Sequence, residues 1–196
     1  VRYGPAVADA RSKVADVLGS VAGLPAIQAC LAHFNVMVKG ISQIFPGGPP
    51  VVNAALDLDI TKEELGGDHI HTRISGCIDN VAETEQDAFD QIRRFLSYLP
   101  SSVGEMAPRG PITDDPERVE ESLLSAMPKN KRATYDARKV LNAVVDKGSF
   151  FEISPLYGRA RILGLARVDG FPVGIMINNP RYNGGSTDVA AGSKAM

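Results

Sequence analysis

Every apolar run in this chain is short, and this feature most restricts the folds that it can adopt. Lysine, aspartate, glycine or proline interrupts each run before it reaches the roughly 18 residues needed to cross a bilayer. The 196 residues include 19 glycines and 13 prolines. Short runs separated by turns are typical of alternating strands and helices. The sequence therefore predicts an α/β (or α+β) fold without a membrane span.

Residue patterns predict where these elements lie. Residues 13–29 have the pattern of a strand, a glycine turn and the start of a helix. Strands are expected at residues 34–39, 41–45, 150–153, 161–168 and 171–178, and helices at 49–56, 61–66, 84–99, from Asp115 with Pro116 in the first turn, and 135–145. Asp169-Gly170 is typical of a two-residue hairpin turn. Residues 69–75 are expected to form a loop.

Capping residues and apolar faces support the prediction of three of these helices. Thr61 and Glu64 have the spacing of a capping box, and Gly66-Gly67 should end that helix. Thr84 should cap the helix that follows it. The apolar residues at helical spacing are Ala88, Ile92, Phe95, Leu96 and Leu99 in that helix, and Val140, Ala143 and Val144 in the helix at 135–145.

The composition indicates which classes of partner the protein can bind and which cell compartment it occupies. The net charge of −2 predicts no basic face for nucleic acid or anionic membrane. The opening residues lack the basic and apolar regions of a signal peptide. Cys30 and Cys77 are too sparse for a disulfide framework, so we expect reduced thiols and a cytoplasmic protein. Residues 101–115, rich in proline and glycine, predict a linker.

The sequence contains few groups of side chains that could catalyse a reaction or bind a metal ion. His69 and His71 flank Ile70 and could begin a metal site, but His33 is the one other histidine, so hydrogen bonding in a loop is favoured and no metal is expected. Cys30 and Cys77 are interpreted as small buried hydrophobes rather than nucleophiles.

Two further patterns could suggest a functional site, but neither supports one. The segment from Gly184 to Lys194 lacks the spacing of a phosphate-binding loop, and no dinucleotide fingerprint occurs. The acidic group Glu63, Glu64 and Asp68 is explained by a helix cap rather than by acid–base catalysis.

What remains is a small-residue turn, Gly19 to Ala26, between a strand and a helix. Small residues let the backbone approach a ligand, and N–H groups at such a turn can hold an oxyanion without a charged side chain. A purely structural turn is the alternative interpretation.

In order along the chain, several blocks resemble the carboxyltransferase (β) subunits of biotin-dependent acyl-CoA carboxylases, nearest to the propionyl-CoA carboxylase type. The blocks are Gly19 to Ala26, HFNVMVKGISQIFPGGPPVV (33–52), TKEELGGDHIHTRISG (61–76), FLSYLPS (95–101), VVDKGSFFEI (144–153), GLARVDGFPVGIMINNP (164–180) and Asp188 to Lys194. The resemblance covers nearly the whole chain.

The resemblance implies a crotonase/ClpP-like superhelix of ββα units, with parts of two tandem domains. Residues 1–100 would be the later part of the first domain, 101–134 a linker and connecting helix, and 135–196 the beginning of the second. The chain would then be part of a longer polypeptide. It would hold at most half of a site, since the family builds each site from two subunits, and we expect it to be inactive alone.

The resemblance also implies a mechanism. The family moves CO2 from carboxybiotin to the α carbon of an acyl-CoA through a thioester enolate that backbone N–H groups stabilise. The catalytic pair would map to Gly23 and Leu24, and the substrate-binding set to Ala22, Gly23, Leu24 and Pro25. Leu24 replaces the family's second glycine, and Pro25 removes the next donor. The second oxyanion hole would lie outside this chain.

Three functions stay open. The first is carboxyl transfer together with a biotin carboxyl carrier protein and a biotin carboxylase subunit, in a homo-oligomer that in complete members is a hexamer, a trimer of dimers. The second is decarboxylation of a malonyl- or methylmalonyl-type CoA, since the same enolate is stabilised in either direction. The third is a non-catalytic assembly module. The acyl group is not fixed by the sequence.

Overall fold

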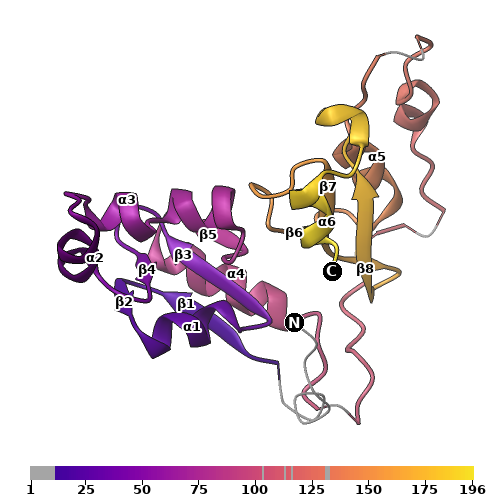
Figure 1. Ribbon diagram of the computed structural model, residues 1–196. Coiled ribbons are helices and arrows are strands. Elements are labelled where there is room, and N and C mark those ends of the chain that lie inside the picture. Colours follow the sequence, from indigo (N-terminus) through magenta and orange to yellow (C-terminus); the bar gives the residue numbers. More distant parts are fainter. Residues whose placement is uncertain (1–11, 103, 113, 116, 131–132) are drawn as a thin grey trace. The chain divides into compact units, whose positions relative to one another are not determined.

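The structure is a computed structural model that describes residues 12–102, 104–112, 114–115, 117–130 and 133–196 (Figure 1). The chain divides into two compact units. The first comprises the described residues up to Leu96 together with Ser101–Met106, and the second comprises Ser97–Pro100 and Ala107–Met196. No helix among the described residues is long and apolar enough to cross a membrane.

The first unit is built on two small parallel sheets. The larger has the order β1 (Val14–Val17), β3 (Phe34–Val38), β5 (Asn80–Ala82), and the smaller pairs β2 (Ser20–Ala22) with β4 (Gln43–Phe45). All five residues of β3 are buried. Four of these five residues are apolar, as suits a parallel strand that helices cover on both faces.

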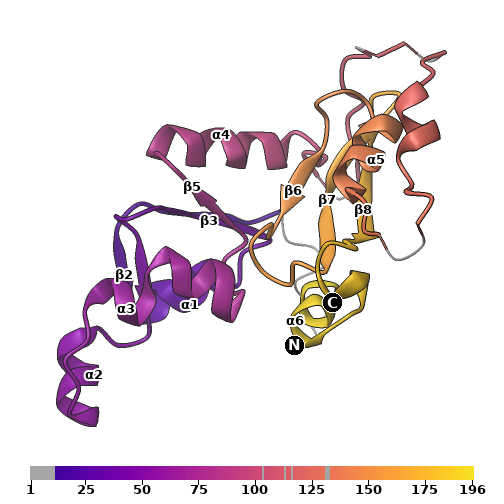
Figure 2. The ribbon, with the colours of Figure 1, turned by 90° about the horizontal axis from the view of Figure 1, so that it is seen from above.

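Helices cover both faces of the larger sheet. In Figure 2, α4 (Glu85–Leu96) lies on one side of it and α1 (Leu24–Cys30) on the other. Phe34 stacks on Phe95 of α4, with ring centroids 4.8 Å apart. Met37, which lies three residues after Phe34 in β3, packs in the core with Ala26 of α1. Phe34 and Met37 are three residues apart, so they lie on opposite faces of the strand, and each packs on one of the two helices.

The caps expected in this unit are confirmed. α2 (Pro49–Leu56) begins with its two prolines, and α3 (Lys62–Gly66) has the complete Thr61–Glu64 capping box and ends at Gly67. The Thr84 hydroxyl accepts from the Asp87 N–H at 3.1 Å at the start of α4. The helix ends at Leu96, before Pro100.

The prediction of a loop at residues 69–75 is wrong. Ile70–Ser75 forms a π-helix, η2, which ends at Gly76 in a left-handed conformation with φ 69°. Thr72 is fully buried, and its hydroxyl donates to the Asp68 carbonyl at 2.8 Å. The burial of Thr72 depends on the surrounding core, which a local sequence pattern cannot reveal.

The second unit holds an antiparallel sheet of β6 (Phe151–Ile153), β7 (Arg161–Val168) and β8 (Phe171–Asn178), in that order. Val168 pairs with Phe171, which confirms the hairpin, and Asp169 and Gly170 have φ values of 51° and 76°. The helix α5 (Ala137–Val144) packs Leu141 and the following Val145 against Ala166 of β7.

Two expectations for this unit are wrong. After Asp115, in place of a helix, the described residues form a turn and then a 3₁₀ helix, η3 (Glu121–Ser125); Pro116 lies outside the described residues. The buried stripe of α5 comprises Ala137 and Leu141, whereas Val144 is 63% exposed. Val140 and Val144 line an open apolar cavity of about 660 Å³ against β8.

The chain closes with a short 3₁₀ helix, η4 (Asn183–Gly185), and α6 (Val189–Lys194). The Lys194 ammonium donates to three backbone carbonyls, those of Ser154 at 2.7 Å, Tyr157 at 3.2 Å and Arg161 at 2.9 Å. Ser154 itself has φ 51°, an uncommon conformation for a residue with a side chain. Lys194 therefore holds the β6–β7 connection onto α6.

Replacing Lys194 with methionine is expected to lower the free energy of unfolding by about 2 kcal/mol or more, because three carbonyls lose a charged donor while the apolar stem stays. Lys147→Met, at an exposed lysine of the same unit, should change it by less than about 0.5 kcal/mol. Urea denaturation would measure both. Equal effects of the two variants would contradict this structural role of Lys194.

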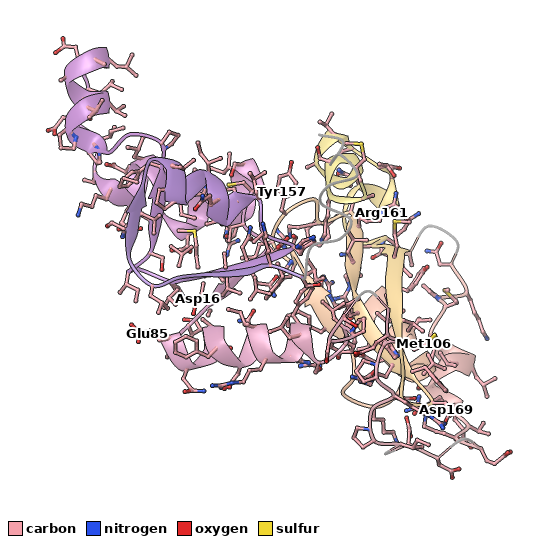
Figure 3. The ribbon with its side chains drawn as sticks, turned by 90° about the horizontal axis from the view of Figure 1, so that it is seen from below. Asp16, Glu85, Met106, Tyr157, Arg161 and Asp169 are labelled. Atoms are coloured by element: carbon pink, nitrogen blue, oxygen red, sulfur yellow. The ribbon has the colours of Figure 1, made fainter. Side chains whose placement is uncertain are left out.

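A second stability prediction concerns Asp16 on β1, near Glu85 at the start of α4 (Figure 3). Both carboxylate oxygens of Asp16 are buried, and no donor in the described part of the chain reaches them. Burial, and then the charge of Glu85, raises the pKa of Asp16 above its ordinary value of 3.8. The folded state therefore binds this proton more tightly than the unfolded state does.

The stability contributed by protonated Asp16 is present below the ordinary pKa and is lost as the pH rises through the raised pKa of the folded state. Asp16→Asn should accordingly raise the melting temperature near pH 7 and change it little near pH 3. Asp59→Asn, at an exposed aspartate, is the matched control and should have no such pH-dependent effect. A melting temperature that falls at pH 7 in the Asp16 variant would contradict the prediction.

Candidate functional site

The turn between β2 and α1 carries the candidate site. Gly23 follows the last residue of β2 and caps α1 with φ 74° and ψ −140°, a conformation that residues with a side chain rarely adopt. Its N–H donates to the Phe45 carbonyl at 3.1 Å and so extends the β2–β4 pairing by one hydrogen bond. Glycine is needed here to turn the chain directly from the strand into the helix.

The backbone donors of this turn can be counted one by one. The Gly23 N–H is taken by Phe45, and Pro25 has no N–H. The N–H of Ala26 donates to the Gly23 carbonyl at 3.1 Å. No acceptor among the described residues reaches the Leu24 N–H, since it lies in the first turn of α1, where a helix offers no partner. Leu24 is thus the available donor.

The surroundings of this donor are uncharged. Ala22 and Pro25 are exposed, Gly23 is half-buried, and the side chain of Leu24 is 65% exposed. Ile27 and Leu31, at helical spacing from Leu24, are 49% and 50% exposed and continue an apolar strip along α1. A single neutral N–H beside an apolar strip suits a carbonyl or enolate oxygen attached to an apolar group.

Sequence reasoning found this turn but did not foresee how its donors are used. The assignment of Gly23 and Leu24 as an N–H pair stays a prediction. In the structure, Gly23 supplies the turn geometry and its N–H faces Phe45, so the available donor of the expected pair is Leu24. Whether a strand continues its pairing for one more residue depends on the neighbouring β4, which no local motif specifies.

The histidines do not form a shared face. His69 is exposed, and His71 lies in η2 with Nε2 2.7 Å from the Ile44 carbonyl. His33 Nδ1 accepts from the Lys13 N–H at 3.0 Å. Within the described residues, no three His, Cys, Asp or Glu side chains are grouped as a metal site requires.

Of the three acidic residues, Glu64 has the capping role that the sequence indicates, whereas Glu63 and Asp68 make other hydrogen bonds. Hydrogen bonds from the Thr61 backbone and hydroxyl lower the pKa of Glu64, as a helix cap should. Glu63 accepts from the Gln43 amide, and Asp68 accepts from the Gly40 N–H at 3.4 Å. The Lys194 ammonium donates to three backbone carbonyls.

The interpretation of Cys77 as a plain buried hydrophobe is wrong. Its Sγ lies 3.1 Å from His71 Nδ1 and 3.1 Å from Ser75 Oγ. Gly76 and Cys77 directly follow η2 and bring the thiol back to the helix that carries the imidazole and the hydroxyl. The sequence signal was the close spacing of His71, Ser75 and Cys77, but a loop there would not have joined them.

The fold class follows from the similarity of this chain to solved structures. The chain has a crotonase-like α/β fold, as expected: it matches the crystal structure of transcarboxylase 12S, solved with hydrolysed methylmalonyl-coenzyme A bound, with a TM-score of 0.87 at 32% identity. That match covers 93% of this chain and 36% of the transcarboxylase chain. A single-chain, multi-domain long-chain acyl-CoA carboxylase matches with a TM-score of 0.76 at 27% identity, over 93% of this chain and 18% of the other.

The chain belongs to the carboxyl transferase domain family, whose model matches residues 12–196. It is 38% identical over 182 residues to the propionyl-CoA carboxylase carboxyltransferase subunit of Haloferax mediterranei, covering 93% of this chain and 35% of that protein. It is also 38% identical over 183 residues to the methylmalonyl-CoA decarboxylase subunit alpha of Veillonella parvula, covering 93% and 36%. The chain thus spans about a third of the length of these relatives.

Proposed function

We propose that this chain is part of an acyl-CoA carboxyltransferase that moves a carboxyl group between biotin and the α carbon of an acyl-CoA. The observation that supports this most strongly is the family match over residues 12–196. The available Leu24 N–H, at a turn of small residues, is consistent with an oxyanion-binding role. We also propose that residues 1–100 belong to a first crotonase-like domain, 101–134 to a connection and 135–196 to the beginning of a second.

The proposed role of the site is to bind and polarise the thioester. The Leu24 N–H would donate to the thioester oxygen, and this bond would strengthen as the oxygen gains charge in the enolate. Gly23 would hold the peptide plane that aims this N–H, while Ala22 and Pro25 border the acyl group without bulk or charge. A leucine at this position adds an exposed apolar side chain beside the acyl chain.

Carboxybiotin, when bound, would supply the carboxyl group and the base. Around this turn the described residues offer one available N–H, which is used for the thioester. We therefore assign none of the described residues to biotin. A carrier protein, a biotin carboxylase and a homo-oligomeric assembly are part of the same proposal, as is a cytoplasmic location, which the two free thiols suit.

A radiolabel assay tests the function and its direction. The protein expressed from its complete gene would be incubated with a biotin carboxylase, a biotinylated carrier, ATP, labelled bicarbonate and either acetyl-CoA or propionyl-CoA. Acid-stable label in the acyl-CoA would support carboxylation. Decarboxylation of methylmalonyl-CoA in the presence of carrier would support the second direction, which the Veillonella relative favours.

The assembly role would be supported if neither reaction occurs and calorimetry detects no binding of CoA or of a biotinylated carrier. That outcome would contradict the proposed activity. The chain of 196 residues alone is expected to be inactive in both assays.

A further inference from the structure

A cluster of thiol, imidazole and hydroxyl groups lies in the first unit, away from the Gly23–Leu24 turn. Cys30 is the last residue of α1, and Cys77 follows η2. Both are half-buried and pack against one core cluster that includes Met37 and Ile44. The fold therefore brings together two free cysteines that are far apart in the sequence.

The hydrogen bonds of His71 fix its tautomer. Its Nε2 lies 2.7 Å from the Ile44 carbonyl, which can only accept, so we assign the proton to Nε2. In the neutral ring, Nδ1 is then a base, and it faces Cys77 Sγ at 3.1 Å. The thiol proton can pass along this contact and leave a thiolate beside an imidazolium. The Ser75 hydroxyl, 3.1 Å from the sulfur, is placed to donate to that thiolate.

The acidities agree with this geometry. A hydrogen bond from Cys30, together with those from His71 and Ser75, lowers the pKa of Cys77 to about 4. The hydrogen bond to Cys77, together with that to Ile44, raises the pKa of His71. The same contact with Cys77, and burial, raise the pKa of Cys30, which therefore stays a thiol. One cysteine is prepared to attack and the other to resolve the product.

We propose that Cys77 is a reactive thiolate that is oxidised by small-molecule disulfides, with Cys30 as the resolving thiol. The Cys77 sulfur attacks one sulfur of a disulfide RSSR. The S–S bond breaks, and RS⁻ leaves and takes up a proton. Cys30 then loses its proton, its thiolate attacks the Cys77 sulfur of this mixed disulfide, and the second RS⁻ leaves and takes up that proton. Two protein thiols and RSSR thus become one protein disulfide and two RSH.

The site is suited to a small reagent, because both thiols are only half-exposed. The disulfide would join the end of α1 to the segment after η2. This inference does not depend on the proposed carboxyl transfer, since it rests on the reactivity of the thiols alone.

The first test measures how the alkylation rate of Cys77 depends on pH in the unmodified protein. Iodoacetamide labelling would be followed at Cys77 by peptide mass spectrometry at about pH 8 and about pH 6. An ordinary thiol, with a pKa of about 8.5, loses roughly 80-fold in rate over this interval. Cys77 should lose less than about threefold, because it is already a thiolate. A loss close to that of an ordinary thiol overturns the proposal.

The second test uses oxidised glutathione and four variants. The unmodified protein should lose both titratable thiols and yield one peptide that links Cys30 to Cys77. Cys30→Ser should instead retain one glutathionyl group on Cys77, and Cys77→Ser should leave Cys30 reduced. His71→Gln should slow alkylation of Cys77 at about pH 6 by roughly tenfold or more, whereas His69→Gln, at the exposed neighbouring histidine, should not. Persistence of both thiols in the unmodified protein overturns the proposal.

Discussion

Replacing Leu24 with proline is expected to lower acyl-CoA carboxylation by the protein expressed from its complete gene by roughly 100- to 1,000-fold, the usual effect of losing one oxyanion-hole donor. The substitution removes the Leu24 N–H, which is the available donor of the turn. Proline is well tolerated at the first position of a helix, and Leu24 occupies that position in α1. The label assay with propionyl-CoA would measure the loss.

Leu24→Ala is the matched control, because it removes the exposed side chain and keeps the N–H. We expect it to retain activity within about threefold of the unmodified protein, since the transition-state contact survives. Thermal denaturation would establish that both variants fold. A folded Leu24→Pro protein with unchanged activity would rule out this N–H as a catalytic donor.

Replacing Gly164 with alanine is expected to destabilise the second unit by about 3 kcal/mol or more, at the upper end of overpacking effects. Gly164 lies in β7 opposite Glu152 of β6. A Cβ at this position would lie 2.2 Å from the Phe151 carbonyl oxygen and 2.6 Å from Phe150 Cε2. The first contact is with backbone, which cannot move without disturbing the β6–β7 pairing.

Gly174→Ala in β8 is the comparison variant, because a Cβ there would meet nothing within 4 Å. It should change stability by less than about 0.5 kcal/mol or stabilise slightly, since alanine reduces the entropy of the unfolded chain. Urea denaturation of both variants gives the difference. Similar values for the two would contradict the close packing at Gly164.

Local rules accounted for the parts of the fold that depend on neighbouring residues. The Thr61–Glu64 capping box needs only its own four residues, and the Asp169–Gly170 hairpin needs only a turn that tolerates positive φ. The family resemblance was likewise contained in the sequence. The π-helix at Ile70–Ser75 and the true buried stripe of α5 were missed, because both involve contacts with distant segments. His71 contacts the Ile44 carbonyl, and Leu141 packs on Ala166.

The candidate site was likewise predicted only in part. Glycine at position 23 was readable as a turn, since few other residues adopt its conformation. The use of its N–H depended on Phe45, a residue on another strand. The thiol cluster was missed for a related reason: Cys30 and Cys77 meet only after α1 and η2 have packed on a common core.

The sequence by itself determined the fold class, the family, the short elements with their caps and the small-residue turn. The elements, their caps and the turn follow from the conformational preferences of residues close along the chain, whereas the family follows from the resemblance of whole sequence blocks. Only the tertiary structure decided which N–H of the turn is available, and that Cys77 lies beside His71. The physical reason is that hydrogen-bond partners and thiol acidity depend on distances of a few ångströms between segments that the chain order does not place together.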